Sequence, residues 1–176
     1  MAEGNLSAGN GVPYWFTVRV KSRHEAKVEQ KLVKKKIEVF SPMYDKLRQW
    51  KDRKKKVKFP LFPGYLFVHV PIIDNDFYRV LKTIGVVDFV KFDFKEPAIV
   101  PDKEIMDIKQ MVNSDKEIDV FPYLKEGTRV RVKRGSLTGV EGVLERKENG
   151  HMLLVSVKLL NRSVAVKIVA EDVEDI

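Results

Sequence analysis

The residue pattern changes partway along the chain, and this change limits the folds open to it. Up to about residue 112, segments of alternating apolar and polar residues are interleaved with segments whose apolar residues recur at helical spacing. From residue 123 onward the period is two throughout, and Gly135, Gly139 and Gly142 fall where turns are expected. We therefore predict an α+β domain followed by a small all-β domain.

The order of the expected elements in the first domain is β-α-β-β-α-β. Strands are predicted over residues 13–20, 37–44, 62–70 and 86–92, and helices over 22–35 and 74–82. Ser22, with Glu25 at capping-box spacing, is the expected N-cap of the first helix, and Asp74 caps the second. This order is typical of the ferredoxin-like split βαβ fold.

Four segments are expected along the chain. Residues 1–12 form a polar, glycine-rich lead-in, 13–112 the α+β domain, 113–122 an acidic linker, and 123–176 a five-stranded β-barrel. A further helix over 102–111, burying Ile105, Met106 and Ile108, ends the first domain. The many valines of the last segment favour a β-barrel over a helical hairpin.

A strongly basic segment precedes an aromatic run, Phe59 to Val68. Such a segment is too polar to fold alone, so we expect a long exposed β-hairpin or loop. It could be a solvated arm, but its charge density favours binding of a polyanion. Trp50 within it could stack on an unpaired base or pack against the domain, and the sequence leaves both open. The eight cations are Lys46, Arg48, Lys51, Arg53, Lys54, Lys55, Lys56 and Lys58.

Two smaller groups of basic residues are further candidates for nucleic-acid binding. Both could equally be ordinary surface charge. The groups are Arg19, Lys21, Arg23 and His24 at the start of the first helix, where free backbone donors attract phosphate, and Arg131, Lys133 and Arg134 in the barrel.

Composition narrows the class of protein. The net charge of +8 and the pI near 9.5 favour a polyanionic partner, and no apolar run reaches the roughly 18–20 residues of a membrane-spanning helix. The chain has no cysteine, which fits a reducing cytoplasm. His24, His69 and His151 are far apart, and no phosphate-binding loop or nucleophile elbow is present, so we expect neither an enzyme nor a metal or other cofactor.

Several of these residues carry a family resemblance. Trp15-Phe16, the run from Phe62 to Val68 and Gly85-Val86-Val87 resemble the N-terminal domain of NusG-family transcription elongation factors. Residues 127–142 resemble the KOW motif of their second domain. The resemblance implies that the first domain binds RNA polymerase. On the third strand Tyr65 and Phe67 share one face, which can stay open as an apolar patch. The expected polymerase-binding residues are Trp15, Phe62, Tyr65 and Phe67, and the alternative is that these aromatic residues belong to the core.

Other stretches are similar to specialised members of that family. Residues 40–43 and 97–101 resemble RfaH-type and LoaP-type antiterminators, and the heavy basic charge leans toward the LoaP-like branch. RfaH-type factors carry a His-Thr-Thr patch that meets the polymerase gate loop, and this chain departs from it with Asp76-Phe77-Tyr78. In the KOW motif, Ser136-Leu137 and Val140 depart from the general factor, which implies weaker recruitment of Rho or the ribosome.

Three functions remain open at this stage. The first is an operon-specific antitermination factor, at the nucleoid in the cytoplasm, recruited by a structured RNA hairpin or by non-template single-stranded DNA. The second is a general elongation factor without a recruitment signal. The third is a ribosome-associated or RNA-binding protein that uses a KOW barrel.

Overall fold

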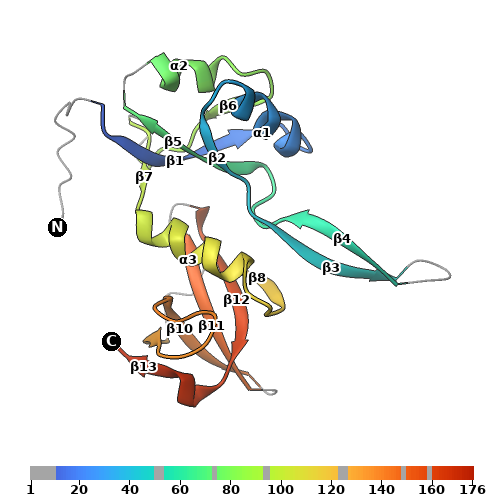
Figure 1. Cartoon of the computed structure of the whole chain (residues 1–176), viewed down its shortest axis with the longest axis vertical. Coiled ribbons are helices and arrows are strands. Elements are labelled where there is room, and N and C mark those ends of the chain that lie inside the picture. The colour runs from blue at the N-terminus through green and yellow to red at the C-terminus, as the bar shows by residue number, and fades with distance from the viewer. Residues whose placement is uncertain are drawn as a thin grey trace. The chain divides into compact units, whose positions relative to one another are not determined.

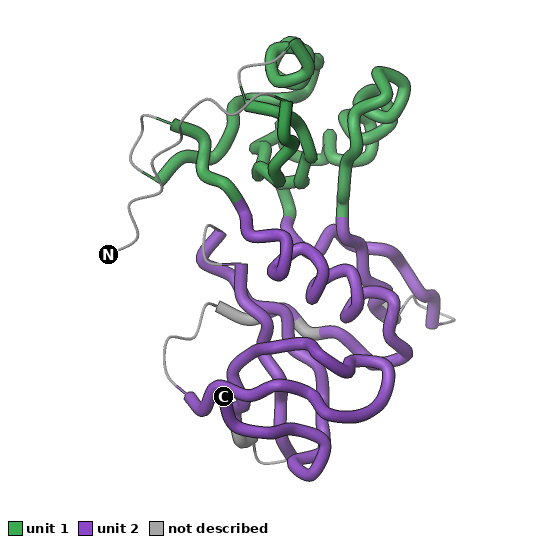
Figure 2. The backbone as a smooth tube through the Cα atoms, turned by 60° about the vertical axis from the view of Figure 1, so that its left-hand side comes forward, with its two compact units in different colours: residues 1–41, 63–99 green, residues 42–62, 100–176 purple. Residues whose placement is uncertain are grey.

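The computed structural model describes residues 11–49, 54–72, 75–92, 96–122, 127–147, 150–157 and 160–176. The chain forms two compact units, which Figure 2 shows in different colours. Residues 1–41 and 63–99 make the first unit, and residues 42–62 and 100–176 make the second. The predicted lead-in, residues 1–12, lies outside the described residues except for positions 11 and 12.

The first unit is a ferredoxin-like α+β fold. Its antiparallel sheet has the order β2-β5-β1-β6, with the short β7 beside β1, and the chain adds helices α1 and α2 (Figure 1). The bounds are β1 Pro13–Val20, α1 Glu25–Lys34, β2 Glu38–Phe40, β5 Tyr65–Pro71, α2 Asn75–Leu81, β6 Val86–Phe89 and β7 Ile99–Val100. The predicted order is confirmed, with a hairpin inserted between β2 and β5.

The core of the first unit joins the sheet to its helices. Phe16 and Val18 of β1 and Leu66 of β5 are buried in one cluster with Val28 of α1. Gly85 has a φ of +109°, and a Cβ atom there would lie 2.7 Å from Cγ2 of Val28. Only glycine therefore lets the chain pass this closely over α1 on its way into β6.

The start of α1 differs from the prediction. The helix begins at Glu25 with His24 at the N-cap, and Ser22 is not the cap. Arg23 takes a left-handed conformation with a φ of 61°, and this turn separates Ser22 from the helix. Oε1 of Glu25 accepts a hydrogen bond from the backbone N–H of Gly64 at 2.7 Å, so Glu25 fixes the turn before β5. Asp74, the predicted cap of α2, lies outside the described residues.

The second unit contains the predicted small β-sheet domain, whose sheet has six strands where five were predicted, because residues 118–122 add a strand. The strand order is β13-β9-β10-β11-β12-β8. The bounds are β8 Ile118–Pro122, β9 Thr128–Val132, β10 Glu141–Lys147, β11 Gly150–Val157, β12 Arg162–Ile168 and β13 Val173–Asp175, with a 3₁₀ turn at Ala170–Asp172. The predicted linker is wrong for residues 118–122, because this segment pairs with β12 as β8.

Helix α3, Asp102–Val112, belongs to the second unit and contacts β11. Ile105, Ile108 and Met111 are buried, at the spacing that places them on one face of a helix. Met106, which the sequence placed in this buried stripe, is 57% exposed. The predicted domain of residues 13–112 thus divides differently in the structure, since α3 and the hairpin of residues 42–62 group with the barrel.

Candidate nucleic-acid interface

The basic segment folds as the predicted β-hairpin. Strand β3, Met43–Gln49, pairs with β4, Lys54–Pro60, in an isolated two-stranded sheet (Figure 1). At its base the backbone N–H of Leu61 donates to the carbonyl of Pro42 at 2.8 Å, and both residues are buried. Further out, the rings of Tyr44 and Phe59 lie 6.3 Å apart. The two ends of the hairpin are therefore joined by a hydrogen bond between buried residues at its base.

The register divides the lysines of the hairpin between two faces. Lys58 is opposite Asp45, and Lys46 is opposite Val57. Since side chains alternate along a strand and paired residues share a face, Lys54, Lys56 and Lys58 lie on one face, and Lys46 and Lys55 on the other. All five lysines are exposed. Polyanions can thus approach the hairpin from either side.

Part of the predicted hairpin site lies outside the described residues. The residues concerned are Trp50, Lys51 and Arg53, together with the side chain of Arg48.

The basic residues before α1 lie in the first unit. Arg19, Lys21 and Arg23 are exposed, and His24 is half-buried. Nδ1 of His24 lies 2.9 Å from the carbonyl oxygen of Ser22, which holds the ring against the turn. The three cations near the start of the helix are therefore accessible to an anion, whereas the imidazole of His24 contacts the backbone of the turn.

In the barrel the predicted cations differ in how far they are neutralised. Arg131 is bonded to Glu141, with Nε at 3.0 Å and Nη2 at 2.9 Å from Oε1. This hydrogen bond is the main cause that lowers the pKa of the Glu141 carboxyl. Lys133 and Arg134 are exposed. The carboxylate of Glu141 thus partly neutralises the charge of Arg131. Lys133 and Arg134 carry most of the remaining positive charge of this group.

Three of the four aromatic residues predicted to bind polymerase are buried, as the alternative of a core position had it. Trp15 is 6% exposed, Phe62 is 1% exposed and Phe67 is fully buried, whereas Tyr65 is half-buried. Aromatic neighbours on the sheet cover part of this surface. Trp15 stacks on His69 with ring centroids 4.7 Å apart, and Phe67 stacks on Phe40 at 6.0 Å. Of the four residues, Tyr65 offers the most accessible surface.

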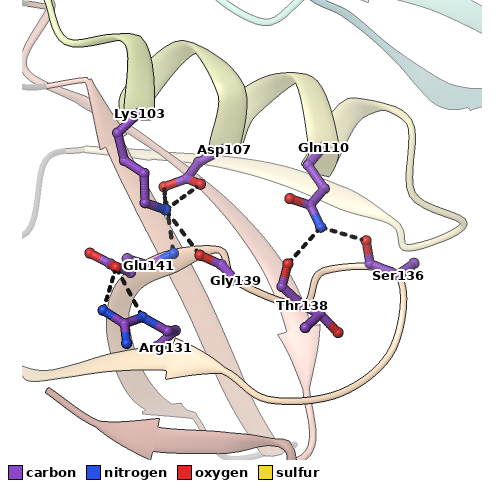
Figure 3. Close-up of polar contacts among 8 residues, drawn as sticks. All are labelled: Lys103, Asp107, Gln110, Arg131, Ser136, Thr138, Gly139 and Glu141. Carbon is purple, nitrogen blue, oxygen red and sulfur yellow. Dashed lines mark hydrogen bonds and ion pairs between the residues drawn. The ribbon is translucent and has the colours of Figure 1, made fainter.

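A polar network that the sequence analysis missed joins α3 to the loop between β9 and β10 (Figure 3). Nζ of Lys103 donates to both carboxylate oxygens of Asp107, at 2.7 and 2.9 Å, and to the carbonyl of Gly139 at 2.9 Å. Nε2 of Gln110 donates to the carbonyls of Ser136 and Thr138 at 2.9 and 3.0 Å. The i, i+4 spacing of Lys103 and Asp107 was the available signal, but nothing in the sequence indicated the loop as their partner.

Asp107 is a buried acid whose pKa is raised. Its side chain is 8% exposed, and this burial raises the pKa of the carboxyl, while the hydrogen bond and charge of Lys103 oppose the rise. Leu137 and Val140, in the same loop, are also buried. The loop between β9 and β10 therefore packs these apolar residues inward and is held by α3 at its backbone carbonyls.

Metal-binding clusters and membrane-spanning helices are not found among the described residues. No group of three or more histidine, aspartate or glutamate side chains able to hold a metal ion occurs in this part of the chain. None of its helices is both long and apolar enough to span a membrane.

The chain is similar over almost its whole length to a family of transcription factors. The family model described as transcription termination factor NusG matches residues 13–109. The chain is 30% identical to the transcription termination/antitermination protein NusG of Staphylococcus carnosus strain TM300, over 96% of this chain and 99% of the relative. It is 29% identical, with the same coverage, to the NusG protein of Staphylococcus aureus strain Mu50.

A solved structure, titled "Domain interaction in Thermotoga maritima NusG", is 26% identical, with 93% of this chain and 97% of that chain covered and a TM-score of 0.49. The extent of the family match and of the similarity to the relatives settles the assignment. The chain belongs to the NusG family of transcription termination and antitermination factors.

Proposed function

We propose that the protein is a specialised antitermination factor that binds RNA polymerase and is recruited through a structured RNA hairpin. The first unit provides the polymerase-binding surface, and the β3–β4 hairpin provides the surface for RNA. Within the family this resembles the RfaH-type and LoaP-type factors. A general elongation factor without a recruitment signal is the second candidate, favoured by the full-length similarity to general NusG proteins.

The observation that supports RNA recruitment is the row of exposed lysines on the hairpin. Lys54, Lys56 and Lys58 share a face, and a strand rise of about 3.3 Å per residue places neighbours in this row about 6.6 Å apart. At that distance two charges repel by only about 0.6 kcal/mol in water, so the hairpin can fold without RNA. A bound phosphate chain would release counterions at each neutralised phosphate, which favours a polyanionic ligand.

Polymerase binding is proposed for Trp15, Tyr65 and Phe67 of the first unit, and Phe62, which belongs to the second unit, is proposed as a separate contact. Tyr65 is the most direct residue to test, because it is half-buried and the other three are buried. We expect Tyr65→Ala to weaken retention of the protein on immobilised RNA polymerase at high salt. Phe92→Ala is the matched control, because Phe92 is an aromatic residue of the first unit that is 63% exposed. Equal retention of the two variants would argue against this surface.

Selection from pools of structured RNA and single-stranded DNA, at about 150–200 mM salt, tests recruitment, because screening at this salt weakens nonspecific binding. Enrichment of one RNA hairpin supports the proposal, enrichment of a DNA motif assigns recruitment to the non-template strand, and a flat result favours the general factor. For an enriched RNA, replacing Lys54, Lys56 and Lys58 with glutamine is expected to flatten the slope of log K against log salt. The slope changes by about 0.7–0.9 for each phosphate that the variant no longer neutralises.

A further inference from the structure

A cleft of about 610 Å³ lies between the β3–β4 hairpin and residues 112–118. Both walls belong to the second unit. Its volume is within the range of sites that hold small ligands or single groups of larger ones. Met43, Val112 and Ile118 supply apolar surface, and the remaining lining is largely polar.

The two walls carry opposite charge. Lys56 and Lys58 extend from β4 on the same face of the hairpin as Asp45, and the facing segment carries Asp115 and Glu117. Lys116 also lines the cleft, which therefore holds equal numbers of lysines and carboxylates. This balance differs from the rest of the hairpin, where cations dominate. The carboxylates therefore favour a ligand that brings a hydrogen-bond donor beside the phosphate bound by the lysines.

The acidic wall is held in place by hydrogen bonds. The backbone N–H of Asn113 donates to the carbonyl of Lys109 at 3.1 Å, and Oγ of Ser114 donates to the carbonyl of Met111 at 2.7 Å. The backbone N–H of Lys116 points to Oγ of Ser114 at 3.4 Å, and Ile118 then enters β8 opposite Val166. The turn that carries the carboxylates is thus fixed to α3 at one end and to the barrel at the other.

The charged side chains of the cleft are available to a ligand. No ion pair within 4.0 Å joins Asp45, Asp115 or Glu117 to a cation in the part of the chain that the structure describes. Asp115 and Glu117 are exposed, as are Lys56 and Lys58. A fitting ligand needs an anionic end for the lysines and a hydrogen-bond-donating end for the carboxylates, with an apolar face between them.

We propose that this cleft holds one unpaired guanine nucleotide of the bound RNA. Its phosphate would lie toward Lys56 and Lys58, and its ring would lie against the apolar lining. The Watson–Crick edge of guanine presents two adjacent donors, N1–H and the N2 amino group, which one carboxylate can accept together. Uracil offers a single N–H on that edge, so the cleft discriminates against it.

The inference rests on the proposed binding of RNA to the hairpin, and the experiment separates the two. The probes are five RNA stem-loops that differ only at one bulged nucleotide, which is guanine, inosine, adenine, cytosine or uracil. Inosine keeps N1–H and lacks the N2 amino group, so it tests the second donor alone. Affinities are measured by fluorescence anisotropy with the full chain at about 150 mM salt.

Wild-type protein is expected to bind the guanine probe about 5- to 150-fold more tightly than the uracil probe, as one bidentate base contact allows. The affinity for the inosine probe is expected to lie between those for the guanine and uracil probes. Replacing Asp115 with Asn and Glu117 with Gln removes this preference. The control variant replaces Asp175 with Asn and Glu171 with Gln, two exposed acids of the same unit, and keeps the preference.

Three results would overturn the inference. Equal affinity for all five probes, combined with weaker binding by Lys56→Gln/Lys58→Gln, refutes the guanine site and leaves RNA binding by the hairpin intact. A uniform gain in affinity on removing Asp115 and Glu117 means that the acidic wall only repels RNA. The third result is that neither Lys56→Gln/Lys58→Gln nor the variant of the opposite face, Lys46→Gln/Lys55→Gln, binds RNA more weakly. This result would contradict RNA binding by the hairpin itself.

Discussion

Replacing Lys103 with methionine is expected to loosen the loop between β9 and β10. Lys103 gives Asp107 two charge-assisted hydrogen bonds and holds the carbonyl of Gly139. A hydrogen bond to a charged group contributes about 1.5–3 kcal/mol, and an exposed ion pair only about 0.2–1 kcal/mol. The side chain of Lys103 is 46% exposed and that of Asp107 only 8%, so solvent screens one partner. We therefore expect the variant to lower the free energy of opening of the loop by about 1–2 kcal/mol, a value between these two contributions.

Hydrogen exchange measures this loss at individual amides. The backbone N–H of Gly139 donates to Val132 and that of Val140 to Leu137, at 2.9 and 3.0 Å. Their exchange is expected to become about 5- to 30-fold faster, which is the factor that corresponds to 1–2 kcal/mol. The amide of Val20, in the first unit, serves as the internal reference.

The effect of Lys103→Met depends on pH in a definite direction. Burial raises the pKa of Asp107, and removal of Lys103 takes away the cation that opposes this rise. An acid whose pKa is higher in the folded state destabilises that state when ionised, and this cost disappears as the pH falls through the folded pKa toward the unfolded value of about 4. The difference between variant and wild type is therefore largest at neutral pH and shrinks on acidification.

Lys27→Met on the exposed surface of α1 is the control and is expected to leave the loop unchanged. Unchanged exchange at Gly139 and Val140 in Lys103→Met at neutral pH would refute the role given to this network. A difference that grows on acidification would contradict the assigned effect of burial on Asp107.

Two further predictions concern the cores of the two units. Ile108→Ala is expected to cost about 2–5 kcal/mol in unfolding free energy and Met106→Ala at most about 0.5 kcal/mol, because only Ile108 is buried. Equal midpoints in urea unfolding would show that α3 does not pack as described. Gly85→Ala is expected to cost about 2–4 kcal/mol through left-handed strain and contact with Val28, whereas Gly135→Ala, with open space around it, costs only about 1–2 kcal/mol of strain. Similar thermal shifts for the two glycine variants would contradict the close packing at Gly85.

Helices and strands were predicted correctly where a single local pattern determines them. The alternation along β1 and the basic hairpin were both predicted, since strand periodicity and charge repulsion are properties of neighbouring residues. The cap of α1 was misplaced because the left-handed turn at Arg23 moves the helix start past Ser22, and capping-box spacing does not reveal such a turn. Met106 was misassigned because a helical pattern admits several apolar stripes, and the partner of the helix selects one of them.

Features that depend on distant residues were missed. Residues 118–122 follow a polar, acidic stretch and were assigned with it to the linker, yet they form β8 because they pair with β12. The contact of α3 with the loop at Gly139 joins residues 36 positions apart, a relation that no local pattern encodes. The cleft beside the hairpin likewise requires residues 43–58 and 112–118 to face each other. The sequence thus supplied the basic hairpin as a candidate site, and the structure supplied its two faces.

The most direct test of the proposed function is terminator read-through by purified RNA polymerase on templates with and without the selected RNA element upstream. The account predicts that the protein raises read-through only when the element is present. It also predicts that Lys54→Gln/Lys56→Gln/Lys58→Gln abolishes this gain. Read-through that is equal on both templates would contradict recruitment by RNA and assign the protein to the general elongation factors.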